Sequence, residues 1–143
     1  MRFWDSSGIV PLLTRQRLTP LAETTFEADP HLSVWWGTPI ECVSALARLE
    51  REGGIAANAM TSALARLRRI SEVWDEVQPS TRVRELAQRL LRSHPLRGAD
   101  ALQLAAAIEV GGEPASRLEF VCFDRRLAEA AGREGLSVIG EHL

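Results

Sequence analysis

The stretch FVCFDRRLAEAA, residues 120–131, decides the fold class. Its first residues belong to an apolar run, Leu118 to Phe123, of the kind found in strands at the centre of a parallel sheet. Asp124 follows at once, and an alanine-rich helical pattern continues to Ala131. A buried strand that leads directly into a helix is the repeating unit of an α/β fold. Asp124 itself either caps the helix or takes part in a ligand site.

The same alternation of strands and helices runs along the rest of the chain. Further strands are expected at residues 2–4, 32–36, 73–77 and 136–139. Helices are expected at residues 9–13, 20–29, 38–52, 56–70, 80–92, 101–110 and 125–131. No repeat, low-complexity tract or linker interrupts the pattern. We therefore predict a single α/β domain over residues 1–143 with a mainly parallel sheet.

The composition is that of an ordinary globular protein, with one informative omission. Of the 143 residues, 45% are hydrophobic and 25% are charged, and the net charge is −2. The 17 basic residues counted as lysine plus arginine are all arginine. Without lysine the chain is neither a P-loop NTPase nor a response-regulator receiver domain, and it performs no Schiff-base chemistry.

The two cysteines and the apolar segments bound the cellular setting. Cys42 and Cys122 form no CxxC pair and lie within apolar runs, so we expect two small buried residues without a disulfide or zinc site. No window is long and apolar enough for a membrane span, and the N-terminus does not resemble a signal peptide. The expected location is the cytoplasm.

Four acidic residues stand where strands end or helices begin. Asp5 and Asp124 each follow a predicted strand directly. Glu41 completes Thr38-x-x-Glu41, the pattern of a capping box. Asp100 lies in the first turn of its helix, where a carboxylate interacts favourably with the helix dipole. Taken singly, each acid is therefore explained by helix capping.

Taken together, the four acids indicate a metal site. The carboxyl ends of parallel strands meet at one edge of a sheet, and ligands of α/β proteins bind there. Carboxylates gathered in one crevice repel one another, and a hard divalent cation such as Mg²⁺ or Mn²⁺ relieves the repulsion. Because no cysteine or histidine is placed as a ligand, zinc is the poorer choice. Such a cation can polarise a phosphodiester and lower the pKa of a bound water.

The order of four motifs resembles a known family. The motifs are FWDSSGIV, TPIECVSALARLE, LRGADALQLAAAI and FVCFDRRLAEAA, and they span nearly the whole chain. Together they resemble the PIN-domain ribonucleases, and most closely the VapC-type toxins of bacterial toxin–antitoxin pairs. The resemblance implies a three-layer α/β/α sandwich, a Mg²⁺- or Mn²⁺-dependent endonuclease that cleaves RNA, inhibition by a cognate antitoxin, and assembly as a homodimer.

The resemblance also assigns the acidic residues. Asp5 and Asp100 match the positions that ligate the metal directly in similar proteins. Glu41 and Asp124 match positions that act either directly or through water. Ser6 stands where the family has a small hydroxyl residue that hydrogen-bonds the acidic cluster.

Residues around the acids leave further alternatives open. Two positions before Asp124 the family often has threonine or serine, but this chain has Cys122, a weaker hydrogen-bond donor. Arg97 and Arg125 flank the acids and either hold RNA phosphates or are solvated, and Arg125 has a nearby acid in Glu129. The adjacent Trp35 and Trp36 point to opposite faces of a strand. One of them is expected in the core, and the other is expected in the core, in a dimer interface or stacked on an RNA base.

Two other functions compete with the nuclease. A PIN-like domain that has lost catalysis would keep the acidic cluster only for folding or for recognition of a protein partner. A phosphatase of the haloacid dehalogenase type would need an acid two residues after Asp5, where the chain has Ser7. The presence of the acids does not distinguish the nuclease from the silent binding module. A measurement of metal affinity would distinguish these two functions.

Overall fold

A five-stranded parallel sheet forms the centre of the molecule. The computed structural model describes residues 1–140, so positions 141–143 of the predicted domain lie outside the description. The strands lie in the order β3-β2-β1-β4-β5, and all four neighbouring pairs are parallel. Their bounds are Arg2–Trp4 (β1), Ser33–Trp35 (β2), Asp75–Val77 (β3), Glu119–Val121 (β4) and Ser137–Ile139 (β5).

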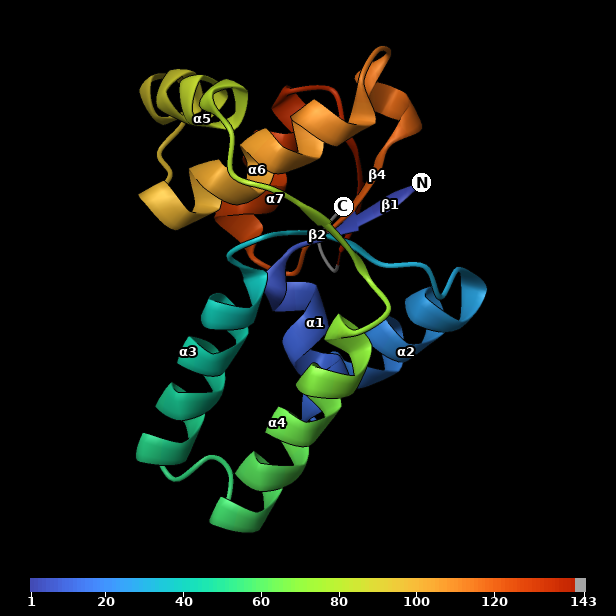
Figure 1. Cartoon of the computed structure of the whole chain (residues 1–143), viewed down its shortest axis with the longest axis vertical. Helices are drawn as coiled ribbons and strands as arrows, with labels where there is room; N and C mark the ends of the chain where they lie inside the picture. The colour runs from blue at the N-terminus through green and yellow to red at the C-terminus, as the bar shows by residue number, and fades with distance from the viewer. Residues whose placement is uncertain (141–143) are drawn as a thin grey trace.

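Helices cover both faces of the sheet, which confirms the predicted α/β/α sandwich (Figure 1). One layer holds α5 (Thr81–Ser93), α6 (Gly98–Gly111) and α7 (Arg125–Arg133). The other layer holds α1 (Ser6–Leu13), α2 (Thr19–Ala28), α3 (Thr38–Arg51) and α4 (Ala57–Ser71), and a short 3-10 turn, Ala115–Arg117, precedes β4. No helix within residues 1–140 combines the length and the hydrophobicity needed to cross a bilayer.

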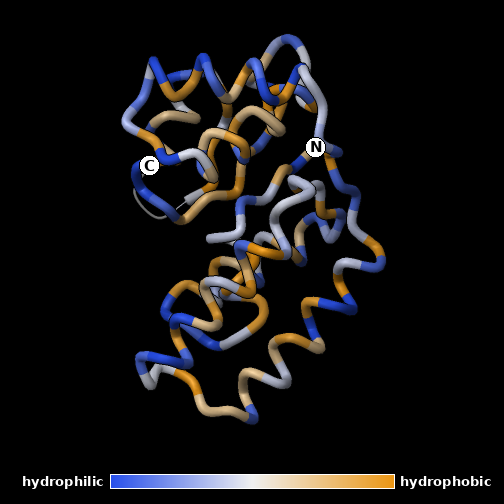
Figure 2. The backbone as a smooth tube through the Cα atoms, turned by 60° about the vertical axis from the view of Figure 1, so that its left-hand side comes forward, coloured by the Kyte–Doolittle hydropathy of each residue, from blue (hydrophilic) through white to orange (hydrophobic). Residues whose placement is uncertain are grey.

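Alternating side chains on the central strands build two cores. Phe3 and Phe120 stack at a centroid distance of 5.9 Å and pack with α5, α6 and α7. Trp4 and Val121, one position further along, point to the opposite face and pack with α1, α3 and α4. This period of two is the geometry of a strand that is buried on both sides. Along the helices, apolar and polar residues also alternate, but at the spacing of helical turns (Figure 2).

The strand order places the ends of β1 and β4 at the centre of the sheet edge. β1 and β4 are neighbours, with Trp4 paired to Val121, although they lie at opposite ends of the sequence. From β1 the chain builds outward through β2 and β3 before it returns to β4 and β5. A crevice opens at such a topological switch point, where the connections leave in opposite directions. Asp5 and Asp124 are the residues that leave the strands there.

Two predicted helix starts are three residues late: α1 begins at Ser6 and α6 at Gly98, against predicted starts at residues 9 and 101. Helix α1 begins at Ser6, three residues before the predicted start, because the Asp5 side chain accepts the backbone N–H of Ser7 and caps it. The pair Thr19-Pro20 also predicts Thr19 as the cap of the second helix, but Leu18 holds the cap position and Thr19 is the first residue of α2. Its hydroxyl instead donates to the Pro11 carbonyl at 2.7 Å and ties α2 to α1.

Candidate active site

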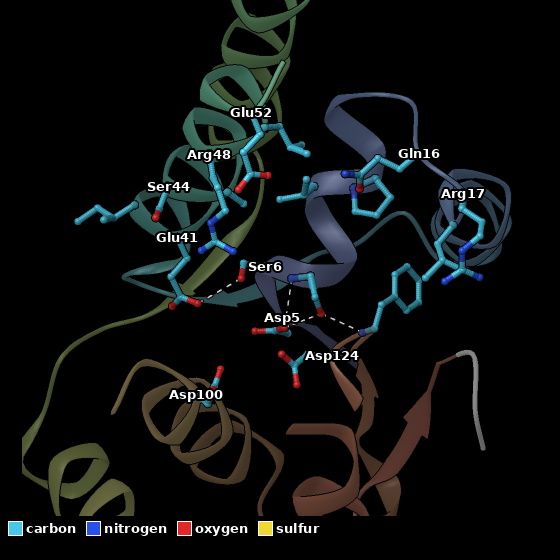
Figure 3. Close-up of a pocket in the computed structure, with 18 residues that line it drawn as sticks. Asp5, Ser6, Gln16, Arg17, Glu41, Ser44, Arg48, Glu52, Asp100 and Asp124 are labelled. Atoms are coloured by element: carbon cyan, nitrogen blue, oxygen red, sulfur yellow. Dashed lines mark hydrogen bonds between the residues drawn. The ribbon is translucent and has the colours of Figure 1, made fainter. Parts of the chain in front are cut away.

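All four predicted acids line one pocket. The pocket has a volume of about 790 Å³ and lies at the carboxyl ends of β1 and β4, between α1, α3 and the first turn of α6. Figure 3 shows the carboxylates of Asp5, Glu41, Asp100 and Asp124 directed into it from four segments of the chain. The parallel sheet therefore gathers residues that are up to 119 positions apart in the sequence (Asp5 to Asp124).

Asp5 is the most buried of the four acids. Its residue is 3% exposed, and its Oδ2 accepts the Ser7 hydroxyl at 2.6 Å and the Ser7 backbone N–H at 3.1 Å. Burial raises the pKa of Asp5 from 3.8 to about 6, the two Ser7 hydrogen bonds oppose this rise, and the charges of Asp100 and Asp124 add to it. The Ser7 hydroxyl also accepts the Phe123 backbone N–H at 2.8 Å and so bridges β4 to α1.

Glu41 does not form the predicted capping box. The cap position of α3 is Gly37, and no side chain caps the helix. The Glu41 carboxylate instead accepts the Ser6 hydroxyl at 3.1 Å and the Gln103 amide at 3.1 Å. Burial and the charge of Asp5 raise the pKa of Glu41 from 4.5 to about 7, while its two hydrogen bonds oppose the rise. Ordinary helix capping therefore does not explain this residue.

Asp100 and Asp124 complete the acidic wall. Asp124 caps α7, because its Oδ1 accepts the Leu127 backbone N–H at 3.0 Å, and it lines the pocket at the same time. Asp100 stands in the first turn of α6 and faces Asp124. Burial and the charge of Asp124 raise the pKa of Asp100, and the positive charges of Arg97 and Arg126 oppose the rise. The capping and pocket interpretations of Asp124 are thus compatible.

The donor set suits a hard divalent cation. Carboxylate oxygens are the ligands that Mg²⁺ and Mn²⁺ prefer. Burial is the main cause of the raised pKa of Asp5, Glu41 and Asp100, repulsion between the acids adds to it, and a cation between these acids would relieve that repulsion. Within residues 1–140 no three Asp, Glu, His or Cys side chains already converge as a ligand set. The acids surround the pocket without meeting at one point, an arrangement that leaves room for the waters that Mg²⁺ retains.

Cys122 does not leave Asp5 without support. Its sulfur lies 3.8 Å from Asp5 Oδ2 and 3.8 Å from the Ser7 hydroxyl, and burial raises the pKa of the thiol, which therefore stays protonated. The strong hydrogen bond to Asp5 comes from Ser7, which the sequence analysis did not assign to the site. Its place two residues after a strand-end aspartate, in the pattern of a side-chain cap, was the available signal.

Of the two alternatives for the flanking arginines, phosphate contact and a solvated surface position, the surface position describes Arg125. Neither Arg97 nor Arg125 lines the pocket, and Arg125 pairs with Glu129 at 3.7 Å on the surface. Arg48 lines it instead, two turns along α3 from Glu41, and its guanidinium points toward Ser6 (Figure 3). The spacing of seven residues between Glu41 and Arg48 puts both on one face of the helix, a signal that the sequence did contain.

The fold and the pocket define a PIN-like domain. No family model matches the chain. Ribonuclease VapC45 of Mycobacterium tuberculosis (strain CDC 1551 / Oshkosh) is 33% identical over 145 residues, which cover 95% of this chain and 92% of that protein. The chain therefore belongs to the VapC ribonuclease family.

Solved structures of low sequence identity share the fold. VapC20 of Mycobacterium tuberculosis, a sarcin-ricin loop cleaving toxin, is 20% identical with a TM-score of 0.65, covering 91% of this chain and 95% of that one. A toxin–antitoxin complex from Klebsiella pneumoniae contains a chain that is 18% identical with a TM-score of 0.65, covering 97% of this chain and 96% of that one.

Proposed function

We propose that this protein is a Mg²⁺- or Mn²⁺-dependent endoribonuclease that acts as the toxin of a toxin–antitoxin pair. One observation carries the proposal: four carboxylates from four separate segments line a single pocket at the switch point of the sheet. Membership of the VapC ribonuclease family supports the same reaction class.

The proposed roles follow from the surroundings of each acid. Asp5 and Asp100 hold the cation directly, and Glu41 and Asp124 complete its surroundings directly or through water. The bound cation would polarise a phosphoryl oxygen and lower the pKa of a bound water, so that the water could attack as hydroxide near neutral pH. Ser7 and Ser6 orient the Asp5 and Glu41 carboxylates through the hydrogen bonds described above. These two serines thus hold two acids of the pocket in place before substrate arrives.

Arg48 is the cation best placed to meet the RNA. It lines the same pocket as the acids, and its side chain forms no hydrogen bond or ion pair with any of the described residues. A guanidinium can bind a phosphate with two parallel hydrogen bonds. We therefore assign Arg48 to the RNA backbone beside the scissile bond, in place of Arg97 and Arg125.

The proposed partners are an antitoxin protein and a second copy of the chain. The Klebsiella pneumoniae neighbour is a toxin–antitoxin complex, which supports the first. Exposed apolar side chains at the start of α3 support an interface, because large apolar groups there face solvent: Trp36 is 48% exposed and Ile40 is 68% exposed. Trp35, by contrast, is a core residue.

A circular RNA tests the proposal, because only an endonuclease can cut a molecule without ends. The purified chain is expected to linearise circular RNAs in the presence of Mg²⁺ or Mn²⁺, and expression of the chain is expected to arrest cell growth. Asp5→Asn keeps a residue type that caps helices well and is expected to remove both effects. Intact circular RNA across several structured substrates would instead favour the catalytically silent binding module.

A further inference from the structure

Gln103 is a buried polar residue in the middle of an apolar helix. Its exposed fraction is 0%. The other buried residues of α6 are Ala101, Leu104, Ala105, Ala106 and Ala107. Glutamine is seldom fully buried, and an amide in an apolar interior costs free energy unless it is hydrogen-bonded. A glutamine at this position therefore needs specific partners.

Both partners of Gln103 lie on α3. Its Nε2 donates to the Thr38 hydroxyl at 3.0 Å and to the Glu41 carboxylate at 3.1 Å, so both amide hydrogens are used. Its Oε1 has no hydrogen-bond partner among the described residues. Turning the amide over would set Oε1 against the carboxylate of Glu41, acceptor against acceptor. The Glu41 carboxylate thus dictates the orientation of the amide, at the cost of a buried carbonyl that goes unsatisfied.

The same turn of α6 also presents Asp100. Residues three apart on a helix are neighbours on its surface, so Asp100 and Gln103 project from one side of α6 toward α3. Asp100 reaches the pocket directly, whereas Gln103 reaches it through Glu41. One turn of α6 therefore carries Asp100 and, through Gln103, holds the carboxylate of Glu41 on α3.

We infer that Gln103 is a positioning residue that holds the Glu41 carboxylate at a set place relative to Asp100. The inference rests on the proposed metal-dependent nuclease function and adds a residue to its machinery. Partners behind the ligands of a metal orient them, and their loss typically costs 10–100-fold in metal affinity or activity.

A competing explanation is that Gln103 only ties the start of α3 to α6 through Thr38. Two substitutions separate these explanations. Gln103→Met keeps an unbranched side chain of similar length and removes both hydrogen bonds. Thr38→Val keeps the shape of the threonine and removes only the hydrogen bond that does not involve Glu41. Gln103→Asn keeps the amide but is one methylene shorter, so it serves if the methionine variant does not fold.

The affinity for Mn²⁺ alone, measured by calorimetric titration of the full chain, is the readout. Gln103→Met and Gln103→Asn are expected to weaken Mn²⁺ binding about 10–100-fold, and Thr38→Val less than about threefold, since the effect travels through Glu41. Wild-type Mn²⁺ affinity in a folded Gln103 variant, or an equal loss of affinity in Thr38→Val, would overturn the inference. The nuclease proposal would still stand in that case if the wild-type chain cleaves RNA. A wild-type chain that neither binds Mn²⁺ nor cleaves RNA would refute both.

Discussion

At the scale of single residues, the site depends on how one aspartate is held. Asp5 is buried at the end of β1, where an ionised carboxylate is costly without partners. Ser7 supplies two of those partners, through its hydroxyl and its backbone N–H. The thiol of Cys122 lies at 3.8 Å and contributes at most a weak interaction. The position of the Asp5 carboxylate therefore depends on Ser7, in the first turn of the helix that Asp5 caps.

Replacement of Ser7 tests this dependence. Ser7→Ala removes the hydroxyl bond to Asp5 and leaves the Phe123 N–H without a partner, so we expect a loss of about 1–3 kcal/mol in the free energy of unfolding together with slower cleavage. Cys122→Ala is the control, because the Cys122 sulfur lies 3.8 Å from the same Oδ2 atom. Chemical denaturation and cleavage assays on both variants give the comparison. Equal activity loss in the two variants would count against the role of Ser7.

Asp5 also predicts how stability depends on pH in the metal-free protein. Its pKa is raised on folding from 3.8 to about 6, so the folded state binds the proton more tightly than the unfolded state. The stabilisation is therefore present at low pH and is lost as the pH rises through about 6, by about 3 kcal/mol for Asp5. Glu41, whose pKa is about 7, acts in the same direction.

The expected result is a difference in stability between two proteins, which removes the contribution of titratable groups that do not interact with Asp5. Relative to wild type, Asp5→Asn should gain stability progressively between about pH 4 and pH 7 in urea unfolding with a chelator present. Saturating Mn²⁺ should stabilise wild type more than Asp5→Asn, because the cation binds the folded carboxylates. A pH-independent difference would contradict the raised pKa.

At the scale of elements, the close approach of α1 to the sheet sets the position of Asp5, Ser6 and Ser7. Gly8 makes this approach possible. A Cβ at Gly8 would lie 3.1 Å from Trp4 Cε3 and 3.1 Å from Val121 Cγ1, so tight that one of these side chains would have to shift. The first turn of α1 can therefore lie directly on β1 and β4, which brings the Ser7 hydroxyl within 2.8 Å of the Phe123 N–H.

Gly8→Ala is thus expected to destabilise the protein, against the usual helix preference. In an open helix, alanine for glycine stabilises by about 1 kcal/mol, whereas overpacking in a core costs about 1–3 kcal/mol. Gly132 in α7 provides the control, since a Cβ there has nothing within 4 Å. Thermal unfolding should move downward for Gly8→Ala and upward for Gly132→Ala. A shift upward for both would show that α1 has room to move.

The elements also show which features the sequence could predict. The apolar strands and the ADAL and FDRR helix starts place Asp5, Asp100 and Asp124 correctly, because each depends on local patterns. Glu41 fits the local pattern of a capping box, yet its carboxylate accepts hydrogen bonds from Ser6 and Gln103. Gln103 lies 62 positions from Glu41 in the sequence. The role of Gln103 depends on the pairing of α3 with α6, and a sequence pattern confined to one helix does not report that pairing.

At the scale of the whole molecule, strand order converts scattered acids into one site. The placement of β1 beside β4 pairs Trp4 with Val121, 117 positions later in the sequence, and α3 and α6 approach the same edge from opposite faces of the sheet (Figures 1 and 3). Burial, with repulsion between the acids added to it, raises the pKa of Asp5, Glu41 and Asp100, so the metal-free pocket carries a repulsion that favours cation binding. The central claim is that this repulsion is relieved by the cation used for RNA cleavage.

The most direct measurement is the rate of cleavage of one labelled RNA as a function of Mn²⁺ concentration, for wild type and for Asp100→Asn. We predict no cleavage in chelator, a rate that rises and saturates with Mn²⁺ for wild type, and for Asp100→Asn a rate lower by about a hundredfold or more because a direct ligand is lost. Cleavage that persists in chelator, or that proceeds equally in the folded Asp100→Asn variant, would contradict the account.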